Sequence, residues 1–241
     1  MCKLKLSGFV LCLLITMQIS GDRAVAQVPG GVSKDVALAQ KPLKNVRLEK
    51  KAIGEFFAHL SMAYDIPLGL EIPRGGGDSG NTSYRVDLEE GTLSDLLAQF
   101  VKEHKQYTWK IDNGVVSVFP TDDYRDPLLR ELLGTEISSF SVPGRKSAGE
   151  FGENLLATVE IRRILEPHGI VVDTGYLGGF HIPHLGRQFS FDVSNMQTKA
   201  ILDKVIKESP FARNWIIENN TLHRKLFLRV CAASEDAVKD P

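Results

Sequence analysis

Histidines are the residues of this 241-residue chain best able to do chemistry, and four of the six lie in its second half. His181 and His184 are the closest pair, and they stand in a glycine-rich stretch at residues 174–186. A zinc site needs three or four ligands within tetrahedral reach, and Asp173 is the one acidic neighbour that the pair offers. We therefore favour a solvated loop, and keep a metal or small-ligand site at His181 and His184 as the alternative.

The sequence lacks the motifs of several common reactions. It contains no Gly-x-Ser-x-Gly, no His-Glu-x-x-His and no pair of carboxylates in a catalytic frame. Residues 143–147, Pro-Gly-Arg-Lys-Ser, are similar to the end of a phosphate-binding loop, but the lysine does not directly follow a glycine. We predict no catalytic residues, no cofactor and no enzymatic activity.

The first residues predict export from the cytoplasm. Two lysines in residues 1–5 precede an apolar run at 6–19, which is short for a membrane span, and Ala24-Val-Ala26 fits a cleavage site. These features predict a signal peptide at residues 1–26. Cleavage would leave Cys231 as the single cysteine, which is common in bacterial periplasmic proteins.

Charge and length limit the function of the mature chain. Loss of residues 1–26 removes three basic residues and one acidic residue, so the formal net charge changes from −1 to −3. A mildly acidic chain offers no electrostatic case for nucleic-acid binding. No second long apolar stretch follows, so we expect no transmembrane segment in the mature chain. The remaining length, about 215 residues, suits two small domains.

Two stretches of the sequence are similar to one another. Asp87 corresponds to Asp192, and Asn113-Gly114 corresponds to Asn219-Asn220. In the first stretch Thr92 and Asp95 predict a capping box at the start of a helix. Asn113-Gly114 predicts a type I′ hairpin, because that turn needs positive φ at both central residues.

Hydrophobic periodicity predicts the remaining elements. Helices are expected at residues 51–64, 151–165 and 197–208, with a short helix at 128–133. Strands are expected at 46–48, 68–72, 84–88, 107–111, 115–119, 136–142, 169–173, 188–193, 215–218 and 222–228. The predicted fold class is α+β, with two tandem small β-α-β / β-α-β-β domains whose helices pack on small mixed sheets.

The first stretch resembles a known family. Residues 46–68, which begin Val-Arg-Leu-Glu, and residues 84–97 with Gly91-Thr-Leu resemble the short N-terminal domain of secretins and TonB-dependent transducers. Tyr107-Thr-Trp-Lys-Ile-Asp-Asn-Gly-Val-Val-Ser-Val118 is similar to the end of that domain. The second stretch resembles a diverged copy that lacks the Gly-Thr-Leu helix start. The resemblance implies a periplasmic signalling or assembly module with a protein partner in the cell envelope, and not an enzyme.

The predicted organisation follows from the repeat and the resemblance together. It comprises a signal peptide (1–26), a flexible leader (27–43), a short N-terminal-like domain (44–120), a linker (121–133), a second, diverged domain (134–230) and a polar tail (231–241).

The hairpins carry the candidate surface for a partner. Small sheets leave unpaired edges, which can accept a partner strand, and a groove between helix and sheet is the other route. The candidate residues are Tyr107, Trp109, Val116 and Trp215. Strand aromatics often pair across sheets, so packing in the core is the competing interpretation for these side chains.

Overall fold

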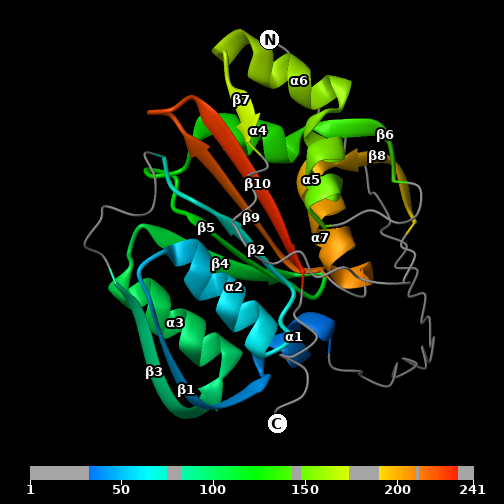
Figure 1. The fold of residues 1–241 in the computed structure, drawn as a ribbon. Helices are drawn as coiled ribbons and strands as arrows, with labels where there is room; N and C mark the ends of the chain where they lie inside the picture. The colour runs from blue at the N-terminus through cyan, green and yellow to red at the C-terminus, as the bar shows by residue number, and fades with distance from the viewer. Residues whose placement is uncertain (1–32, 75–82, 143–147, 174–189, 210–211, 233–241) are drawn as a thin grey trace, which may run out of the picture. The chain divides into compact units, whose positions relative to one another are not determined.

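A computed structural model describes residues 33–74, 83–142, 148–173, 190–209 and 212–232, all of which belong to one unit, residues 32–241. The candidate histidines His181 and His184 and the predicted signal peptide lie outside the described residues. The fold is α+β, with helices packed on mixed sheets. Figure 1 shows the arrangement of the helices and strands.

The elements follow one another in two series. The first comprises α1 (Lys34–Ala39), β1 (Pro42–Lys50), α2 (Ile53–Ala63), β2 (Leu68–Glu71), β3 (Tyr84–Thr92), α3 (Leu93–Glu103), β4 (Tyr107–Asp112) and β5 (Val115–Pro120). The second comprises α4 (Pro127–Gly134), β6 (Glu136–Val142), α5 (Ala148–Leu156), α6 (Val159–Leu165), η1 (Glu166–His168), β7 (Val171–Asp173), β8 (Phe191–Gln197), α7 (Thr198–Glu208), β9 (Ala212–Asn220) and β10 (Lys225–Ala232).

The two series pair their strands in the same way. In the first, β1 pairs with β3 and β4 pairs with β5, both antiparallel, while β2 runs parallel to β5. In the second, β6 pairs with β8 and β9 with β10, both antiparallel, while β7 runs parallel to β10. Each series therefore has a two-stranded ribbon and a three-stranded mixed sheet.

The two three-stranded sheets join into one sheet. β2 pairs in parallel with β9, and the strand order is β4-β5-β2-β9-β10-β7. In Figure 1, β2 and β9 lie side by side at the centre of this sheet. The join is head to tail, because the β2 edge of the first series meets the edge of β9, the counterpart of β4.

The helices of the two series cover opposite faces of the sheet. Side chains alternate between faces along a strand, so the neighbouring pairs Leu70–Ile216 and Gly69–Trp215 face opposite ways. Ile216 belongs to the core cluster built with α2 and α3, whereas Trp215 belongs to the cluster built with α4 to α7. β9 thus contributes to both cores.

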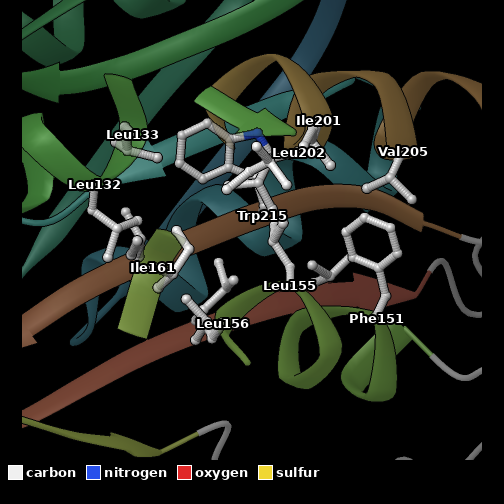
Figure 2. Packing of buried hydrophobic residues seen from close by; sticks show 14 of the residues in the cluster. Leu132, Leu133, Phe151, Leu155, Leu156, Ile161, Ile201, Leu202, Val205 and Trp215 are labelled. Atoms are coloured by element: carbon white, nitrogen blue, oxygen red, sulfur yellow. The ribbon is translucent and has the colours of Figure 1, made fainter. Parts of the chain in front are cut away.

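Trp215 fills the second core at the junction. Its side chain is 1% exposed, and Figure 2 shows it between leucines of α4 and α7. Its indole N–H donates to the Asp203 carboxylate at 2.9 Å. The indole also lies over the backbone of Gly69, where an added Cβ would be 2.2 Å from Cζ2 of Trp215. Gly69 therefore lets β2 and β9 pair beneath the ring.

Two local signals are confirmed by the structure. Thr92 accepts from the Asp95 amide and Asp95 accepts from the Thr92 amide, which is the predicted capping box of α3. Asn113 and Gly114 have φ values of 54° and 76°, and they connect β4 to β5 as a type I′ turn requires.

Other expectations differ from the structure. The single helix at 151–165 is divided into α5 and α6, because the chain breaks at Thr158, whose hydroxyl donates to the Leu155 carbonyl. Asn219 is not a turn residue: it lies buried in β9, opposite Leu226. The second hairpin instead turns through residues 221–224, and Arg224 takes the positive φ of 50°.

The segments expected as a leader and a linker both contain regular structure, and the short helix expected at 128–133 is present in the second of them. The leader expected at 27–43 includes α1 and the start of β1. The segment at 121–133 includes most of α4, whose N-cap Asp126 accepts from the Leu128 and Leu129 amides. The leucines of α4 lie in the second core, so this segment is packed against the sheet and α7.

Filling the space at Gly69 should destabilise the junction. Gly69→Ala places a methyl group against the rigid indole of Trp215, and we expect a loss of about 2 kcal/mol in the free energy of unfolding. Chemical denaturation measures it. Gly134→Ala is the control, because a Cβ there meets nothing within 4 Å. Equal stability of the two variants would contradict the proposed role of Gly69.

Candidate functional site

The edge formed by β4 is the candidate binding site. β4 is an outer strand of the six-stranded sheet, and within the described residues no strand pairs with its far side. Its partner on the inner side is β5, with Trp109 opposite Val118 and Ile111 opposite Val116. An outer strand offers backbone N–H and C=O groups to an incoming strand.

Two residues of β4 point their backbone groups outward. The Val116 amide donates to the Pro67 carbonyl at 2.9 Å, so Val116 bonds toward β2 and does not exchange backbone bonds with Ile111. The Thr121 amide donates to the Gln106 carbonyl at 2.9 Å, so Gln106 and every second residue after it bond toward β5. The N–H and C=O groups of Trp109 and Ile111 therefore face away from the sheet.

The short helix α1 lies at one end of this edge. Its Asp35 carboxylate accepts from the Gly114 amide in the β4–β5 turn, and Leu38 packs on the first core. Ser33 caps the helix by accepting from the Val36 amide at 3.3 Å. These contacts place α1 beside the hairpin turn and mark one end of the site.

The residues chosen from the sequence are divided by the structure. Tyr107 and Val116 are buried against α2 and α3, and Trp215 is buried in the second core, so their side chains cannot form the expected partner surface. These positions agree with the competing interpretation of core packing, because the pleat points the side chains at the helices. Trp109 lies on the same strand as Tyr107, but its side chain is only half-buried.

The second hairpin is also not an available edge. β9 corresponds to β4, but β2 occupies its outer side. Pairing between strands this far apart leaves no local sequence signal, so the sequence could not distinguish the two hairpins. The one indirect signal was Gly69, because glycine inside a strand often marks a close approach of another group.

The alternative site at His181 and His184 lies outside the described residues. Among residues whose positions are described, no group of three or more His, Cys, Asp or Glu side chains could hold a metal ion.

One buried carboxylate lies beside the junction. Glu71, at the end of β2, has a side chain that is 3% exposed, and it accepts from Nε and Nη2 of Arg125 at 2.8 and 2.6 Å. Burial raises the pKa of Glu71, and the ion pair with Arg125 opposes that rise. The bidentate pair, with the guanidinium 5.4 Å from the Phe119 ring centre, indicates a structural role.

A second polar contact connects the same segment to β9. Asp126 is buried, and besides capping α4 it accepts from the Asn219 side-chain amide at 2.9 Å. Arg125 and Asp126 are adjacent in the sequence. Arg125 bonds to Glu71 of β2, and Asp126 bonds to Asn219 of β9. The segment before α4 therefore connects β2 to β9 at one end of their pairing.

No protein-family model matches this chain, and no curated protein or solved structure matches it either. The helices of the described part are all too short or too polar to cross a membrane.

The raised pKa of Glu71 predicts a pH dependence of stability. The folded chain holds this proton more tightly than the unfolded chain, so the free energy of unfolding should fall as the pH rises from the ordinary carboxyl pKa through the raised folded-state value. Glu71→Gln should reduce this fall, as measured by denaturation between about pH 4 and pH 7.

Glu90→Gln, at an exposed ion pair with Lys44, controls for the removal of one negative charge. A Glu71→Gln chain with the same pH slope as the parent chain would show that the buried carboxyl does not cause the effect.

Proposed function

We propose that this chain is a non-enzymatic protein-interaction module of the bacterial cell envelope, exported to the periplasm, which binds an extended segment of a partner protein at the outer edge of β4. The outward backbone groups of Trp109 and Ile111 carry the proposal. The resemblance to the short N-terminal domains of secretins and TonB-dependent transducers supports a role in signalling or assembly.

Strand addition suits the properties of this edge. Backbone hydrogen bonds provide affinity for a partner strand, and side-chain contacts beside the edge provide specificity. Trp109 and Ile111 each pack partly on the first core, so the edge is held by α2 and α3 before a partner arrives. A preorganised edge loses less conformational entropy on binding than a mobile loop does.

A photo-crosslinking residue at Lys110 tests the site in the native periplasm. The Lys110 side chain is exposed on β4, so we expect an adduct with a specific partner. Adding Ile111→Pro should abolish the adduct, because proline removes an outward N–H while the bonds from β4 to β5 remain. Binding is read from the mobility of the tagged chain on a denaturing gel.

The same crosslinker at Val171 is the control, since this residue is 62% exposed on β7 at the opposite edge. An adduct at Lys110 that survives Ile111→Pro, in a chain that still folds, would contradict strand addition at β4.

Export has its own test. Expressed with its own N-terminus in a Gram-negative host, the chain should appear in the periplasmic fraction and begin at Gln27 after cleavage behind Ala26. N-terminal sequencing and intact mass report the cleavage. A cytoplasmic chain that keeps Met1 to Ala26 would contradict the proposed location.

A further inference from the structure

The molecule contains a filled copy of the β4 edge, which is unpaired among the described strands. β4 and β9 each follow a helix of 11 residues, α3 and α7, and each is antiparallel to the last strand of its series. Both carry the same pattern, Trp109-Lys-Ile111 and Trp215-Ile-Ile217. Both tryptophans stand opposite a valine of the hairpin partner, Val118 and Val230.

The strand on β9 shows what such an edge accepts. β2, with the sequence Leu-Gly-Leu-Glu, runs parallel to β9, and its Gly69 lies directly opposite Trp215. The Ile72 amide donates to the Ile217 carbonyl at 2.9 Å, so the outward groups of β9 are used by this strand. Any residue larger than glycine would clash with the indole, because its Cβ would lie 2.2 Å from Cζ2 of Trp215.

We infer that β4 binds an extended partner segment that runs parallel to it and places a glycine opposite Trp109. The inference rests on the proposed function, whose partner it describes. It follows from the backbone groups that face outward on the two strands. Those of Trp109 and Ile111 on β4 correspond to those of Trp215 and Ile217 on β9.

The residue after the glycine is acidic, because the Trp-x-Ile patterns of the two edges differ at their middle position. Leu70 of β2 lies opposite Ile216, and the counterpart of Ile216 on β4 is Lys110. The Lys110 side chain is exposed, near Asp112 at 3.9 Å. A carboxylate across the strands from a lysine is favourable, whereas leucine there gains little. The partner therefore carries Gly-Glu or Gly-Asp.

The two charged side chains of α7 that contact the indole of Trp215 have no charged counterpart on α3. Asp203 of α7 accepts from Nε1 of Trp215, and Lys199 lies 5.8 Å above the Trp215 ring. The equal length of α3 and α7 places Ala98 and Ser94 at the counterpart positions on α3. Neither can supply a carboxylate or an ammonium group to the indole of Trp109.

A labelled peptide tests the inference with the full mature chain. The peptide copies residues 66–73, carries Leu70→Glu, and is extended by lysines for solubility. Fluorescence anisotropy should show saturable binding. A second peptide with valine in place of the glycine should bind about tenfold more weakly, and so should the first peptide to an Ile111→Pro chain.

Two variants of the chain complete the experiment. Val172→Pro removes an outward N–H from β7, since the neighbouring Val171 amide bonds to the Arg224 carbonyl, and this chain should bind like the parent. Ile111→Ala keeps the N–H and should bind more tightly than Ile111→Pro. A peptide that displaced β2 from β9 would bind the Ile111→Pro chain as well as the parent chain. Unchanged binding to Ile111→Pro would therefore overturn the inference.

The remaining outcomes distinguish failure of the inference from failure of the proposed function. Equal binding of the glycine and valine peptides overturns the inference, while the crosslink at Lys110 can still support strand addition. A third outcome is that light scattering shows the parent chain to self-associate and Ile111→Pro to abolish this association. That result would assign the β4 edge to a second copy of the chain and overturn the inference of a separate partner.

Discussion

The parallel pairing of β2 with β9 is the contact on which the rest of the structure depends. It converts two three-stranded sheets into one and requires glycine at position 69, because the indole of Trp215 lies over that backbone. It also leaves β9 buried on both faces, with Ile216 in one core and Trp215 in the other. A loss of this pairing would expose both cores, so the two series cannot separate without a large cost.

The join also decides which edges of the six-stranded sheet stay unpaired within the described residues. A head-to-tail contact uses one edge of each series and leaves the other, so the outer strands of the described sheet are β4 and β7. β7 has three residues and is the shorter of the two, whereas β4 has six and carries Trp109. β4 therefore offers the longer row of backbone groups.

The sequence contained the local structure but not the join. Thr92 with Asp95 and Asn113 with Gly114 act over three residues or fewer, and both were predicted correctly. The β2–β9 pairing links Gly69 to Trp215 across the whole repeat, and the role of Asn219 depends on Asp126, far from it in sequence. Trp109 and Trp215 have the same local pattern, so their different burial could follow only from the tertiary pairing.

Under the proposed function, the two copies of one edge would serve two purposes. At β9 the incoming strand belongs to the same chain, so its effective concentration is high and the pairing is permanent. At β4, a similar strand from another molecule would lose its translational freedom on binding, so the proposed contact would be weaker and reversible. Lys110 in place of Ile216 fits this difference, because a charged residue on an open edge opposes nonspecific sheet growth.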